Sequence, residues 1–177
     1  MSCNMTTGYN DRTCTNGKGG IKSVLLFPLG ATLGAVVSGT NELTSLTVTG
    51  DTFLYKLKSN LSSFTAPVRV DKNNGTLWYE HELSMILASD SKELRQEIHL
   101  LAQNECVCLV ENADGTIVAL GLGEGLQVAD ANEYSSGVLK SDRKGHVILM
   151  RGMENDEVPD VNATLYNTLL AQQSPVI

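Results

Sequence analysis

The sequence predicts a mainly β fold, either a β-sandwich or a partly closed barrel, with one flanking α-helix. About eight short segments alternate large apolar residues with polar ones or are rich in β-branched residues, as half-buried strands are. Turn residues separate these segments at short intervals. Only residues 90–104 show clear helical spacing of apolar side chains. Strands with a single helix indicate packed layers around one core.

The first third of the chain contributes strands alone. Residues 21–27 form an apolar first strand, which Pro28 and Gly30 end. Residues 30–40 are dotted with glycine and fit either a loop or an irregular strand. Further strands are expected at 43–49, 53–58 and 62–70, and a five-residue turn at 71–75.

The stretch from Trp78 to Gly121 has the strongest pattern. Residues 78–85 alternate as a strand. Residues 89–93 offer N-cap candidates for the helix, with Asp90 and Glu93 spaced as a capping box, and Asn104 is the expected C-cap. A β-hairpin then joins 105–111 to 116–120 through Asp114-Gly115, a dipeptide typical of tight hairpin turns.

The last third is less regular. The glycine-rich run 121–125 interrupts a strand that resumes at 126–128, and 129–141 is polar enough for a surface loop. The last clear strand is 145–152, and an acidic turn follows it. The apolar residues after Val161 fit a short helix or an extended tail. The predicted organisation is therefore an N-terminal arm at 1–20, a sandwich domain at 21–160 and a C-terminal tail at 161–177.

Charge and cysteine content narrow the function classes. The formal net charge of −7 argues against a duplex-DNA binder with many phosphate contacts, although it leaves open a surface past which DNA slides. Cys106 and Cys108 are two apart in a predicted strand and are expected to face one side as small buried apolar residues. Cys3 and Cys14 lie in the polar arm, where a disulfide or metal site is the minor alternative. Neither a secretory leader nor an apolar run of about 20 residues is visible, so synthesis in a cytosol is expected.

The sequence offers no catalytic constellation, cofactor site or metal site. The run 121–125 has its third glycine one residue too early for a dinucleotide loop, and Gly17-Lys18-Gly19-Gly20 lacks the flanking residues of a phosphate loop. The three histidines, His81, His99 and His146, fall in separate elements. We therefore predict that the chain is not an enzyme and needs no cofactor.

The order of elements resembles the tail-tube-like structural proteins of tailed bacteriophages. The similarity covers roughly residues 56–160: a strand with paired aromatics (Trp78-Tyr79), the helix at 94–104, the hairpin at 112–115, and an acidic, proline-bearing end. The leader with Cys3 and Cys14 is similar to small ring or tube proteins of phages of gut bacteria.

The resemblance implies a virion protein of the tail or neck, assembled in the host cytoplasm. Copies would form a ring, commonly sixfold, around a channel through which genomic DNA passes without specific binding. Its partners would be other copies and neighbouring ring, tail or portal-complex proteins, with no membrane involved. Tube, connector and stopper rings all remain open. The alternative is a β-sandwich module that binds carbohydrate or a receptor.

Subunit contacts are expected in three segments: residues 3–20, the loop 31–41 and the loop 129–144. The candidate interface residues are Cys3, Cys14, Lys18, Ile21, Gly34, Asn41, Tyr134, Lys140 and Arg143.

Overall fold

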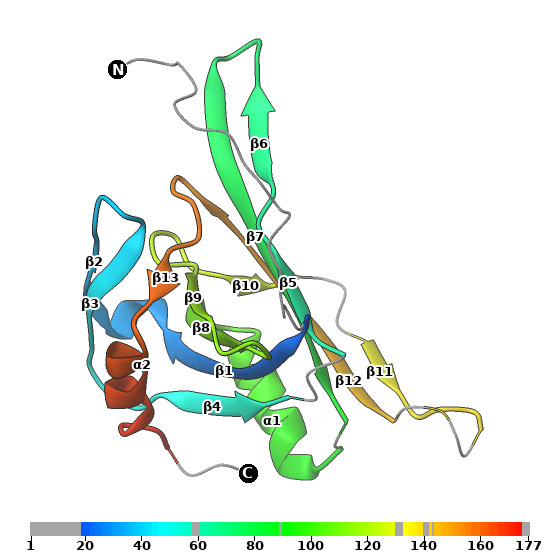
Figure 1. The fold of residues 1–177 in the computed structure, drawn as a ribbon. Coiled ribbons are helices and arrows are strands. Elements are labelled where there is room, and N and C mark those ends of the chain that lie inside the picture. The colour runs from blue at the N-terminus through cyan, green and yellow to red at the C-terminus, as the bar shows by residue number, and fades with distance from the viewer. Residues whose placement is uncertain are drawn as a thin grey trace.

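In the computed structural model the chain forms two β-sheets packed face to face, with two α-helices beside them (Figure 1). The structure describes residues 19–57, 61–88, 90–129, 133–139, 142 and 144–174, without the side chain of Leu33. The prediction of a mainly β, sandwich-like fold with a flanking helix is confirmed, and over the described residues neither sheet closes into a barrel.

The first sheet has seven strands in the order β2-β3-β13-β9-β8-β1-β4. All neighbours are antiparallel except β13 and β3. A 3-10 turn, η1 (Leu29–Ala31), joins β1 to β2. The strands are β1 (Ile21–Pro28), β2 (Thr32–Val37), β3 (Glu42–Val48), β4 (Phe53–Lys56), β8 (Cys106–Asn112), β9 (Ile117–Leu120) and β13 (Asp160–Val161).

The second sheet is built on two long antiparallel strands, β7 (Thr76–Leu87) and β12 (Gly145–Glu154). Short strands line their outer edges: β5 and β6 pair with β7, and β10 and β11 pair with β12. These four are β5 (Ser63–Thr65), β6 (Val68–Asp71), β10 (Gln127–Val128) and β11 (Glu133–Ser135).

The central strands of the first sheet, β1, β8 and β9, have nearly continuous apolar sequences because both of their faces are buried. In β8, Cys106 and Cys108 point into the core between the sheets, whereas Val107 and Leu109 point to a second core on the opposite face. The prediction for the two cysteines is therefore confirmed. A continuous apolar run is what a strand covered on both sides requires.

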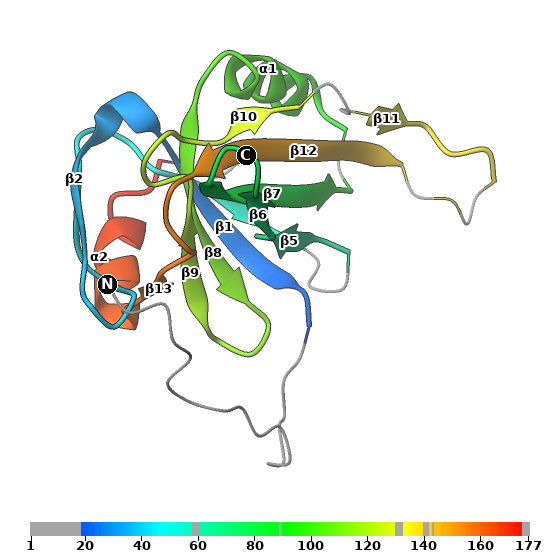
Figure 2. The ribbon, with the colours of Figure 1, turned by 90° about the horizontal axis from the view of Figure 1, so that it is seen from above.

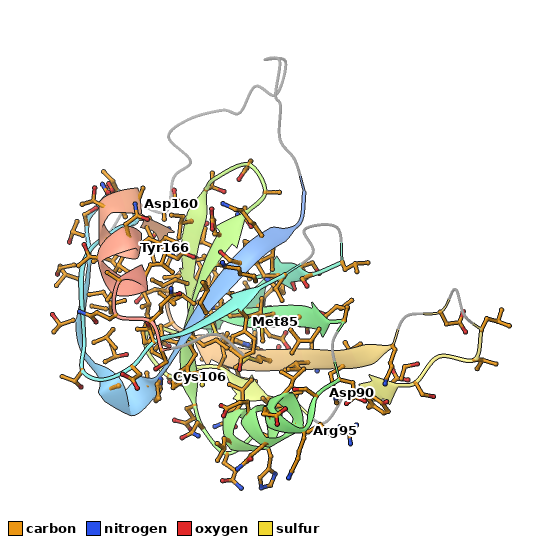
Figure 3. The ribbon with its side chains drawn as sticks, turned by 90° about the horizontal axis from the view of Figure 1, so that it is seen from below. Met85, Asp90, Arg95, Cys106, Asp160 and Tyr166 are labelled. Atoms are coloured by element: carbon orange, nitrogen blue, oxygen red, sulfur yellow. The ribbon has the colours of Figure 1, made fainter. Side chains whose placement is uncertain are left out.

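The second core is closed by α2 (Ala163–Leu170), which packs Tyr166 and Leu169 against the first sheet (Figures 2 and 3). Thr52 anchors this helix, because its hydroxyl donates to the carbonyl of Leu169 over 3.2 Å. The assignment of 161–177 to a tail is corrected: the described part, up to Ser174, belongs to the domain. The apolar face of the central strands would otherwise stand in water.

The predicted helix is α1 (Lys92–Leu101), and of the N-cap candidates at 89–93 it uses Ser91. Ser91 accepts from the amide of Leu94 at 3.0 Å, so the Asp90–Glu93 capping box is wrong by one residue. Asp90 is instead engaged by Arg95. At the other end the C-cap is Ala102, and Asn104 contributes by donating its side-chain amide to the carbonyl of Leu100 at 2.7 Å.

Two segments contain strands: one that fits either a loop or an irregular strand by its sequence, and one that is expected as a loop. Most of 31–41 is β2, which bulges next to Gly34 and pairs with β3. Asn41, at φ 59°, supplies the left-handed turn between them, a conformation that asparagine tolerates. Within 129–144, β11 pairs with β12. Conversely, the strand expected at 62–70 divides into β5 and β6, which separate around Pro67, a residue without an amide hydrogen for the ladder.

Two hairpins extend beyond the body. The β6–β7 hairpin rises above the sandwich, and the β11–β12 hairpin extends sideways (Figures 1 and 2).

Candidate functional site

The β6–β7 hairpin exposes an apolar face. Alternation along β7 places Leu77, Tyr79 and His81 on the same side as the buried Leu83 and Met85. The hairpin therefore prolongs the core-facing side of the second sheet past the edge of the first.

Cross-strand pairing adds two valines to this face. Val68 lies opposite Tyr79 and Val70 opposite Leu77. Val70 is 57% exposed and Leu77 is 53% exposed, values unusual for large aliphatic side chains gathered in one place.

Below this face lies a groove of about 740 Å³. One wall is the start of β7, the opposite wall is the β2–β3 turn, and the loops after β9 and β12 close the end. The volume falls within the roughly 300–1,000 Å³ of pockets that enclose a drug-sized ligand. Its lining includes Val37, Leu77, Tyr79, Leu122, Asp156 and Glu157.

His81 forms part of the groove's base and is only 2% exposed. Its Nδ1 accepts from the amide of Gly121 at 3.3 Å, which leaves the proton on Nε2. Nε2 is buried without a hydrogen-bond partner among the described residues. Burial lowers the pKa of His81 to about 4, against a smaller opposite effect of the Asp156 backbone, so the ring is neutral at neutral pH.

The glycine-rich loop 121–125 binds a carboxylate of its own chain. The amides of Gly123, Glu124 and Gly125 donate to the carboxylate of the buried Glu154 over 3.0–3.3 Å. Gly123 permits this approach, because a Cβ there would lie 2.6 Å from a Glu154 oxygen. The clamp fixes the acidic loop after β12 and leaves Asp156 and Glu157 exposed at the groove's rim.

Apolar side chains are also exposed near the end of the β11–β12 hairpin. Val138 is 95% exposed and Leu139 is 69% exposed. Both backbone amides donate to Asp142, over 2.8 and 2.7 Å, and these bonds lower the pKa of that carboxyl group. The turn is therefore held by its own hydrogen bonds while its two aliphatic side chains face water.

A charged cluster fixes the base of this hairpin to α1. The largely buried carboxylate of Asp90 accepts two hydrogen bonds from Arg95, at 2.6 and 2.7 Å, and one from the Tyr134 hydroxyl at 3.0 Å (Figure 3). Lys144 lies 3.3 Å from the same carboxylate, and the Tyr134 ring packs against His146 at 5.0 Å. The Arg95 hydrogen bonds hold the pKa of Asp90 well below its usual range.

The predicted interface residues are scattered. Cys3, Cys14, Lys18, Lys140 and Arg143 lie outside the described residues.

The other four differ in exposure. Ile21 is 1% exposed in the core between the sheets, so its assignment to an interface is wrong. Its neighbour Gly20 ends the arm, and the alternation of β1 turns Ile21 inward. Asn41 lines the groove but donates its side-chain amide to Val158 at 3.0 Å. Gly34 is exposed on β2, and Tyr134 is half exposed in the hairpin-base cluster.

The sequence reading missed Val70, Leu77, His81 and Glu154 as parts of one site. The sequence did contain a signal for Leu77. The alternation of β7 begins at Thr76, two residues before the predicted start of the strand, so Leu77 belongs to the same face as Tyr79 and His81. Nothing local marks Glu154, whose partners are about thirty residues away.

The described side chains present a binding geometry without a metal cluster. Among them, no three His, Cys, Asp or Glu residues lie together as a metal site would require. No described helix is long and apolar enough to span a membrane. Comparison of the chain with protein-family models, with curated proteins and with solved structures finds no match.

Proposed function

We propose that this chain is a virion structural protein that assembles into a ring or tube around the DNA channel of a tailed phage. The observation that carries the proposal is the pair of projecting hairpins, each with large aliphatic side chains in water. Exposed apolar patches of this kind mark surfaces that bind other proteins.

The positions of the hairpins favour assembly of like copies. They leave the sandwich in different directions, so a single neighbouring copy cannot cover the apolar side chains of both hairpins (Figure 2). Contacts between unlike surfaces of identical subunits lead to closed rings or to helical tubes. Tail tube, connector and stopper ring are all compatible with this arrangement, and neighbouring tail or portal-complex proteins would bind the ring's two ends.

The charge of the chain suits a channel through which DNA moves. A net charge of −7 repels phosphate, and a lumen without many lysine and arginine contacts would not retain the duplex. The proposal places the protein in the tail or neck of the virion after assembly in the host cytoplasm.

The test is mass measurement by light scattering over a rising concentration series, with negative-stain electron microscopy of the same samples. We expect a species of fixed subunit number with an annular outline and an open centre. Monomers at every concentration would contradict the proposal. An accompanying gel-shift assay should show no retention of duplex DNA at physiological salt.

A binding module for carbohydrate or a receptor is the second candidate, because the groove is large enough for a ligand. Carbohydrate sites commonly stack sugars on tyrosine, tryptophan or phenylalanine side chains, and among these types Tyr79 alone lines the described groove. A glycan-array signal that disappears in Tyr79→Ala, from a chain that stays monomeric, would favour this candidate.

A further inference from the structure

We infer that the groove beneath the β6–β7 hairpin is the docking site for the Val138-Leu139 turn of a second copy of this chain. The inference deepens the proposed function and rests on it, because it assigns the contact through which copies join.

The two surfaces match in chemistry. Leu77 and Val37 line opposite walls of the groove, and Val68 and Val70, which pair with Tyr79 and Leu77, extend the apolar face of the hairpin beside it. The turn offers a valine and a leucine that are almost fully solvated in the single chain. Docking removes both apolar surfaces from water, which is the main source of affinity in protein association.

Charge complementarity favours this occupant. Exposed Asp156 and Glu157 stand at the rim of the groove, and Glu154 is clamped just behind them. The sequence from Val138 to Arg143 contains two basic residues, Lys140 and Arg143, against one acidic residue, Asp142, and the next residue, Lys144, is engaged by Asp90. Electrostatic attraction steers a basic turn toward an acidic rim, and the same charge pattern disfavours acidic segments as occupants of the groove.

The described residues of the turn also have hydrogen-bond partners before it binds. Asp142 holds the amides of Val138 and Leu139, and the Asp90 cluster holds the base of the hairpin against α1. A surface that is already ordered loses less conformational entropy on association. The N-terminal arm is a poorer occupant, because its first twenty residues are dominated by glycine, asparagine, threonine and charged side chains.

The geometry makes the contact heterologous. The groove lies between the β2–β3 turn and β7, whereas β11 and its turn extend from the other side of the sandwich (Figure 2). Each copy therefore offers one turn and one groove to two different neighbours. Repetition of this contact gives a ring if the rotation closes.

Two full-length double variants test the inference. The turn variant carries Val138→Glu and Leu139→Glu, and the groove variant carries Val70→Glu and Leu77→Glu. All four positions are exposed, so both chains should fold, which circular dichroism and thermal unfolding verify. A control with Leu61→Glu and Leu100→Glu adds the same charge at exposed positions elsewhere.

We expect each test variant alone to weaken self-association by about 100-fold or more, and the control to assemble as the wild type does. An equimolar mixture of the two variants should form a 1:1 dimer, because one intact turn meets one intact groove. The altered turn and altered groove repel each other, so growth stops at the dimer.

The outcomes separate this inference from the proposed function. Wild-type rings that persist in the turn variant would overturn the docking assignment and leave the ring proposal intact. Loss of assembly in the groove variant alone would show that another segment occupies the groove. A wild-type chain that never self-associates would overturn both.

Discussion

The strongest quantitative prediction concerns the pH dependence of folding and the buried His81. Its ring is almost completely buried in the folded chain, and this burial lowers its pKa from 6.5 to about 4. Between those values the unfolded chain binds a proton that the folded chain does not. The free energy of unfolding must therefore fall as the pH drops below about 6.5, and the loss is complete near pH 4.

The size of the effect follows from the pKa difference. The full shift corresponds to about 3 kcal/mol, of which about 2 kcal/mol is lost between pH 7 and pH 5. Carboxyl groups with lowered pKa values, such as Asp71, Asp114 and Asp142, act in the same direction, but mainly below about pH 5. The interval from pH 7 to pH 5 thus excludes most of the contribution of these carboxyl groups.

The assay is urea unfolding at pH 7 and pH 5, at a concentration where the chain is monomeric. The wild type should lose about 2 kcal/mol over this interval, whereas His81→Gln should lose little, because its amide does not titrate. His99→Gln, which removes an exposed imidazole from α1, is the matched control and should keep the wild-type loss. Equal losses in wild type and His81→Gln would refute the reasoning.

Three further predictions address the Glu154 clamp, the start of β12 and the core between the sheets. Glu154→Ala should lower the free energy of unfolding by about 2 kcal/mol, because three backbone amides lose a charged acceptor. Glu154→Gln should lower it by less, and equal stability of the two variants would contradict the clamp. Gly145→Ala should lower the free energy of unfolding, measured in urea, by about 3 kcal/mol, because Gly145 has a φ of +148° and a Cβ there would overlap the carbonyl oxygen of Leu87. A variant as stable as the wild type would show that β12 can shift. Burial raises the pKa of Cys106 to about 11 and that of Cys108 well above its usual value, so both thiols should be unreactive in the folded chain. At pH 8, two more thiols per chain should react with a thiol reagent after unfolding in urea than before it. Equal numbers of reactive thiols would disprove their burial.

Much of the fold was predictable because its signals are local. Alternation identified β7 and β12, Asp114-Gly115 identified the β8–β9 turn, and the spacing of Leu94, Ile98 and Leu101 identified α1. Boundaries were less accurate where two neighbouring residues offer similar caps, as Asp90 and Ser91 do. In the structure Arg95 donates to the Asp90 carboxylate, and Ser91 caps the helix.

The candidate site was largely beyond sequence reasoning. Of the expected contact segments, 31–41 turned out to supply a wall of the groove and 129–144 to supply the exposed turn, but the individual residues were mostly others. Val138 and Leu139 look ordinary in the sequence. Their significance comes from an exposure that depends on how far the hairpin extends from the sandwich.

The sequence by itself determined the β-rich class, the helix, the tight turns, the inward direction of Cys106 and Cys108 and the negative charge, because each depends on spacing within a few residues or on composition. The tertiary structure decided that α2 closes a second core, that loop 121–125 clamps Glu154, and that an acidic-rimmed groove and an apolar turn lie apart on one molecule. These features join residues tens of positions apart, and burial, which sets their energies, exists only after the sheets have packed.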